Sequence, residues 1–93
     1  MDMVHCERCG TTWLMPSALD ADVCRDFAAS IRGGDTIGAI RRLRQATGLS
    51  LRDAKAVWRH VTRSPGECNY CRAPLSSEAT AACANCRSLN LNW

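Results

Sequence analysis

The 93-residue sequence predicts a small α+β protein, in which three helices in the middle of the chain lie between cysteine-rich elements with short strands at either end. Three Cys-x-x-Cys pairs flank the middle of the chain, and three apolar stripes with helical spacing lie within it. A chain of this length has a small hydrophobic core. We therefore expect bound metal ions to contribute much of its folding free energy.

The C-terminal cysteines form the most specific metal-binding pattern. Cys68 and Cys71 are followed, after eleven residues, by Cys83 and Cys86. Two such turns supply the four thiolates of a tetrahedral zinc site. Because four thiolates leave no position for water or substrate, the pattern predicts a structural zinc and not a catalytic one. Iron in the same four-sulfur shell is the alternative.

The N-terminal pair, Cys6 and Cys9, predicts a second zinc site only if two further ligands are found. The candidates are His5, Cys24 and His60. The helical phase of Cys24 favours a packed apolar residue. His60 falls at the end of a predicted helix, where it could fold over the N-terminal pair or lie on the surface near the helix dipole. The further ligands of this second site stay open.

The first third of the chain predicts one strand and one helix. Residues 11–13 favour extended structure. Ser17 and Asp20 have the spacing of a capping box, so a helix is expected from there to Arg32, where two glycines follow. Its apolar stripe consists of Leu19, Val23, Cys24, Phe27, Ala28 and Ile31.

The middle of the chain predicts a helical hairpin over residues 36–62. Asp35 or Thr36 can cap its first helix, Gly48 suits a left-handed turn, and Ser50–Asp53 has the form of a second capping box. The apolar positions are Ile37, Ala39, Ile40 and Leu43 in the first helix, and Leu51, Ala54, Val57, Trp58 and Val61 in the second.

A final strand is expected where Leu89, Leu91 and Trp93 alternate with polar residues. These elements divide the chain into an N-terminal zinc knuckle (1–16), a helical segment (17–63) and a C-terminal four-cysteine zinc ribbon (64–93).

Charge and cysteine usage narrow the function classes. Residues 32–63 hold eight basic and two acidic residues, so an acidic partner would be attracted to the middle of the chain. The N-terminus lacks the features of a secretory signal, and seven cysteines cannot all pair, which predicts a reduced, cytoplasmic protein. No nucleophile motif or phosphate loop is present, so an enzyme is not expected.

The segment TIGAIRRLRQATGLSLRDAKAVW, at residues 36–58, resembles the helical hairpin in the C-terminal domain of the bacterial ribosomal stalk protein. That family has the pattern K-I-x-x-I-K-x-x-R-x-x-T-G-L-G-L-K-E-A-K across the same turn, and its hairpin docks translational GTPases. The resemblance implies a partner-binding role for one set of residues here. These are Ile37, Ile40, Arg41, Arg44 and Lys55.

Two alternatives to this docking role remain. The hairpin could serve only as a scaffold, or the partner could be a nucleic acid. Arg52, Lys55, Arg59 and Arg63 follow one another at spacings of three and four, which places them on one helix face where they could neutralise phosphates. The sequence therefore predicts a zinc-binding interaction module for a protein such as a translational GTPase or a ribosome-associated factor, with a nucleic-acid-binding zinc ribbon as the alternative.

Overall fold

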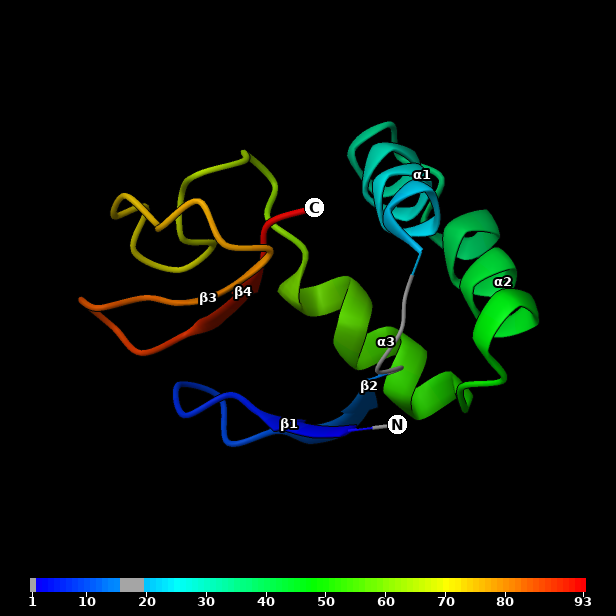
Figure 1. Cartoon of the computed structure of the whole chain (residues 1–93), viewed down its shortest axis with the longest axis horizontal. Coiled ribbons are helices and arrows are strands. Elements are labelled where there is room, and N and C mark those ends of the chain that lie inside the picture. Colours follow the sequence, from blue (N-terminus) through cyan, green and yellow to red (C-terminus); the bar gives the residue numbers. More distant parts are fainter. Residues whose placement is uncertain (1, 16–19) are drawn as a thin grey trace.

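A computed structural model describes residues 2–15 and 20–93. It shows the expected small α+β fold with three helices and two antiparallel hairpins of short strands (Figure 1). In chain order the elements are β1 (Asp2–His5), β2 (Thr12–Met15), α1 (Ala21–Arg32), α2 (Thr36–Thr47), α3 (Leu51–His60), β3 (Thr80–Ala82) and β4 (Leu89–Leu91). None of the helices in the described ranges has the length and apolar character needed to cross a membrane.

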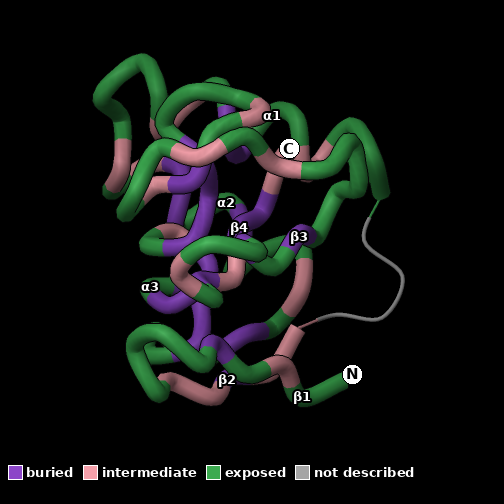
Figure 2. The backbone as a smooth tube through the Cα atoms, turned by 90° about the vertical axis from the view of Figure 1, so that its left-hand side faces the viewer, coloured by how far each residue is buried: buried purple, intermediate pink, exposed green. Residues whose placement is uncertain are grey.

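Helix α3 lies at the centre of the molecule, where it contacts α2, β2 and β4 (Figure 1). Much of α3 is buried, whereas the loops of the cysteine-rich ends are largely exposed (Figure 2). Ala54 and Val57 are fully buried on this helix, and they belong to the same core cluster as Trp13 of β2 and Leu91 of β4. Both ends of the chain therefore pack on one hydrophobic core.

The ends of the helical hairpin follow the predicted turn chemistry. The Asp35 carboxylate accepts a hydrogen bond from the Gly38 N–H at 3.1 Å and caps α2. Gly48 has a φ of 76°, and its N–H donates to the Arg44 carbonyl at 2.8 Å. The Ser50 hydroxyl accepts from the Asp53 N–H at 3.1 Å at the start of α3. Helices α2 and α3 thus form at the predicted place, and α3 ends at His60, two residues before the predicted end of the hairpin at residue 62.

The carboxylate of Asp53 differs from the expected capping box. It accepts from the Ser50 hydroxyl at 3.0 Å and from the backbone N–H of Leu14 at 3.4 Å, and not from the Ser50 backbone. Leu14 belongs to β2, so this buried carboxylate ties the first turn of α3 to the N-terminal hairpin.

Helix α1 begins later than predicted. Asp20 has extended backbone angles and acts as the N-cap, because its carboxylate accepts from the Asp22 N–H at 2.7 Å. Asp20 therefore does not lie inside the first turn. The expected cap Ser17 and the apolar Leu19 lie outside the described residues.

Two apolar residues of the predicted helix stripes are exposed. Ile37 is 78% exposed and Leu51 is 45% exposed. Each lies in the first turn of its helix, and both line an open groove between α2 and α3. Ala39, Ile40 and Leu43 form the buried side of α2 as expected.

The strand predictions were incomplete. β2 and β4 were expected, but their partners β1 and β3 were not. β3 has the sequence Thr-Ala-Ala, which has little intrinsic strand preference, and it forms because it pairs with β4. β4 also ends at Leu91, two residues before the expected Trp93, whose ring instead contacts Phe27 edge-on at 6.2 Å.

Candidate metal centres

All three Cys-x-x-Cys segments adopt the same turn. The residue after the second cysteine has a left-handed φ, and its N–H donates to the carbonyl of the first cysteine at 2.8 to 3.0 Å. The N–H of that first cysteine in turn donates to the carbonyl five residues later. The left-handed residues are Gly10, Arg72 and Arg87, with φ of 73°, 61° and 66°. Arg72 and Arg87 adopt this conformation although it is uncommon for residues other than glycine. The hydrogen bonds of the turn therefore outweigh the backbone preference of these two residues.

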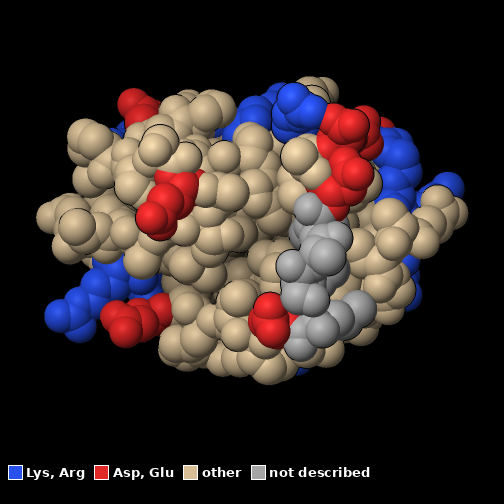
Figure 3. All heavy atoms as spheres, viewed as in Figure 1, with Lys and Arg blue, Asp and Glu red and all other residues tan. Residues whose placement is uncertain are grey.

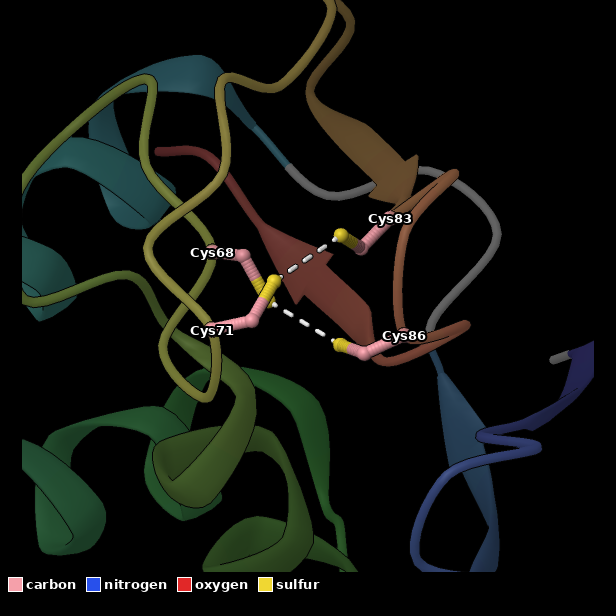
Figure 4. A group of neighbouring side chains, drawn as sticks. All are labelled: Cys68, Cys71, Cys83 and Cys86. Carbon is pink, nitrogen blue, oxygen red and sulfur yellow. Dashed lines mark hydrogen bonds between the residues drawn. The ribbon is translucent and has the colours of Figure 1, made fainter.

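Two of these turns bring Cys68, Cys71, Cys83 and Cys86 together. Their sulfurs point toward a common centre from two facing loops (Figure 4), and all lie within 4.8 Å of one another. The Cys68–Cys86 and Cys71–Cys83 sulfur distances are both 3.5 Å. In a tetrahedral shell with metal–sulfur bonds of the usual length, sulfurs lie about 3.8 Å apart. The four predicted ligands therefore form a cluster that could hold one metal ion.

The four thiols cannot all ionise at once without a cation between them. A hydrogen bond from the Asn85 side chain and one from the Ala73 backbone lower the pKa of Cys71 to about 6. At Cys86 the Ser88 backbone acts to lower the pKa, but burial and the three neighbouring cysteines raise it to about 12. A divalent ion would stabilise all four thiolates together.

A second cluster forms from Cys6, Cys9 and His60. Their ligand atoms lie within 4.8 Å of one another, and the Cys9 sulfur is 3.4 Å from Nε2 of His60. Of the three candidates suggested by the sequence, the structure thus selects His60. The ring of His5 instead pairs with the Thr12 hydroxyl at 2.7 Å, and Cys24 lies outside both clusters.

His60 is held as a metal ligand usually is. Only 5% of the residue is exposed, and its ring stacks on Trp13 with 4.3 Å between centroids. Nδ1 lies 2.7 Å from the Ala56 carbonyl, which requires that Nδ1 carry the proton and donate it. Nε2 then has its lone pair free on the side of Cys9, and such an outer hydrogen bond orients histidine ligands in metal sites.

The C-terminal ribbon supports the N-terminal cluster directly. The backbone N–H of Leu89 in β4 donates to the Cys6 sulfur at 3.3 Å. Burial acts to raise the pKa of Cys6, but the hydrogen bonds from Leu89 and from Cys9 outweigh it and lower the pKa to about 6. The Arg8 guanidinium also lies over the Tyr70 ring at 4.9 Å. Two cysteine-rich segments from opposite ends of the chain are therefore packed together.

The five residues assigned to partner binding also meet in space. Ile37, Ile40, Arg41, Arg44 and Lys55 all line a groove of about 540 Å³ between α2 and α3. Comparisons of the chain with protein-family models, curated proteins and solved structures found no match. The likeness of residues 36–62 to a stalk hairpin therefore stays a prediction from the motif.

Sequence reasoning missed part of the groove wall. Gln45, Leu49 and Leu51 also line it. Leu51 follows the Ser50 cap directly, and first-turn residues are less enclosed by their own helix than later ones. That position was the available indication that Leu51 would not join the core.

Proposed function

We propose that this protein is a non-enzymatic zinc-binding interaction module, which docks a protein partner in the groove between α2 and α3. The observation that carries the proposal is the groove lining. Five residues chosen from a short sequence motif come from two helices and line one cavity. A hairpin used only as scaffold would not need its apolar residues on the open side.

The chemistry of the groove suits an acidic segment with apolar side chains. Ile37 and Leu51 offer exposed apolar surface. Arg41 and Lys55 make no hydrogen bond or ion pair within residues 2–15 and 20–93, so both charges remain available. The groove lining in these ranges includes no carboxylate. Apolar anchors supply most interface free energy, while the surrounding cations select an oppositely charged partner.

Surface charge on the molecule is uneven. On the face seen in Figure 1, Lys and Arg side chains lie around the rim and the middle holds almost none (Figure 3). An acidic partner would therefore be attracted to the rim of this face, where α2 lies, and not to its middle. The resemblance to the stalk hairpin suggests a translational GTPase, or another ribosome-associated factor, as that partner.

In this proposal zinc has a structural role. One ion bound by Cys68, Cys71, Cys83 and Cys86 would fix the C-terminal ribbon, and a second bound by Cys6, Cys9 and His60 would fix the N-terminal turn. Both hairpins contact α3, since β2 and β4 pack against it. Zinc binding would thus hold the docking hairpin in place by supplying folding free energy of about 10 kcal/mol per structural ion.

Binding to purified translational GTPases, measured by isothermal titration calorimetry, tests the proposal. The groove variant is Arg41→Glu with Lys55→Glu, and the matched control is Arg25→Glu with Arg63→Glu, which changes the total charge equally outside the groove. We expect the groove variant to weaken binding at least about tenfold and the control by much less. Equal losses in the two variants would show non-specific attraction and contradict docking in the groove.

The nucleic-acid alternative gives a different result in the same experiment. Each phosphate contact would contribute about one unit to the slope of log affinity against log salt concentration. If the partner is a nucleic acid, Ile37→Ala should change the binding affinity little. Strong binding to an RNA or DNA oligonucleotide with this salt dependence, and none to the GTPases, would replace the proposed function.

A further inference from the structure

The Cys6, Cys9 and His60 cluster contains three protein ligands, whereas the C-terminal cluster contains four. Among the described residues, no further Cys, His, Asp or Glu has a ligand atom in it. Zinc sites with three protein ligands keep the fourth position for water or an exogenous ligand. Such a site needs access from solvent.

A cavity of about 610 Å³ provides that access. Cys9 and His60 both line it, and Cys9 is exposed while Cys6 is fully buried. The volume falls in the range of small-molecule sites. The opening therefore lies on the side of Cys9 and His60 and not on the side of Cys6.

The cavity is lined by three cations. Arg52, Lys55 and Arg59 line it, and its lining within the described ranges includes no carboxylate. Arg52 approaches the Asp53 carboxylate only at 3.9 Å and is itself 80% exposed, so its guanidinium remains free to bind a ligand. A divalent ion bound by two thiolates and a neutral imidazole forms a site with no net charge. The charge of a ligand at the open fourth position is therefore selected by the three cations.

Two aromatic residues complete the cavity lining. Trp13 lines it beside His60, on whose ring it stacks, and its indole N–H is buried with no acceptor in the described part of the chain. Tyr70 also lines it, with the Arg8 guanidinium 4.9 Å from its ring centroid. The two rings give the cavity apolar walls beside its three cations.

We infer that the metal held by Cys6, Cys9 and His60 keeps its fourth position open to this cavity and there binds a phosphate oxygen, with Arg52 and Arg59 on the phosphate. Zinc accepts oxygen ligands, and guanidinium groups match phosphate geometry with paired hydrogen bonds. The inference rests on the second metal ion of the proposed function. It is independent of the docking groove apart from Leu51 and Lys55, which line both cavities.

The test uses the full chain loaded with cobalt(II) in place of zinc. Inorganic phosphate, a mononucleotide and a short single-stranded oligonucleotide are titrated separately, and visible absorption and phosphorus NMR line width are followed. The four-thiolate site has no open position and should not respond. The variants are Arg52→Gln with Arg59→Gln, His60→Gln, and Arg63→Gln as a control cation outside this cavity. Lys55 is left unchanged so that the docking groove keeps its charge.

We expect a saturable response to inorganic phosphate in the wild-type chain and in Arg63→Gln. The double variant should bind phosphate roughly tenfold more weakly at unchanged cobalt content, and His60→Gln should lose one cobalt and the response. A response to the oligonucleotide alone would identify nucleic-acid phosphates as the source of the same ligand. Two bound cobalt ions with no response to any probe, or an equal response in the double variant, would overturn the inference. A single bound cobalt in the wild-type chain would overturn the second metal site itself.

Discussion

Replacing Ile37 by alanine should weaken partner binding without weakening the fold. Ile37 is 78% exposed in the first turn of α2, so the substitution should change the free energy of unfolding by no more than about 0.5 kcal/mol. Alanine removes three methyl or methylene groups, each contributing about 0.8 kcal/mol when buried. If a partner covers most of the exposed side chain, the loss is about 1 to 2 kcal/mol, or roughly five- to thirtyfold in Kd.

Two matched variants make this prediction specific. Met3→Ala removes another exposed apolar side chain, 61% exposed on β1, and should leave both Kd and stability unchanged. Ile40→Ala removes a side chain that is only 8% exposed, and it should cost about 2 to 5 kcal/mol of stability. Calorimetric titration gives Kd, and denaturant unfolding gives stability. An Ile37→Ala chain that binds its partner as tightly as the wild type would refute the docking surface.

Three further outcomes are expected. Cys68→Ser should lose one metal equivalent and unfold or aggregate, because the ion supplies much of the folding free energy; a stable, monomeric variant by circular dichroism and gel filtration would argue against this. Cys24→Ala should cost about 1 kcal/mol or less and leave the metal content unchanged, since Cys24 lies on α1 outside both clusters. Burial raises the pKa of Cys24, so in the metal-loaded, reduced protein this thiol should be alkylated slowly at pH 7, which mass spectrometry of the labelled peptides can check.

The helical part of the fold could be predicted from local sequence chemistry. The Asp35 and Ser50 caps and the left-handed Gly48 act within a few residues, so their effects are visible in the sequence. The start of α1 was misplaced because Asp20 can serve either as a cap or as a first-turn residue. Only its backbone angles decide between these roles.

One metal cluster could be predicted from the sequence and the other only in part. Cys68, Cys71, Cys83 and Cys86 are close in the chain, and their spacing predicts that they form one cluster. The pairing of Cys9 with His60 spans fifty-one residues and depends on how β2 packs against α3. The contact of Leu89 with the Cys6 sulfur spans eighty-three residues and had no counterpart in any motif. Such long-range contacts are set by the shared core, which a single sequence does not reveal.

We expect two metal ions to hold the ends of this chain around the α2–α3 hairpin. Native mass spectrometry of the protein purified under reducing conditions, with elemental analysis of the same sample, tests this expectation. We predict two zinc ions per chain, one of which is lost in His60→Gln while Cys24→Ala keeps both. A folded chain that carries no metal and holds its cysteines in disulfides would contradict the proposed metal sites.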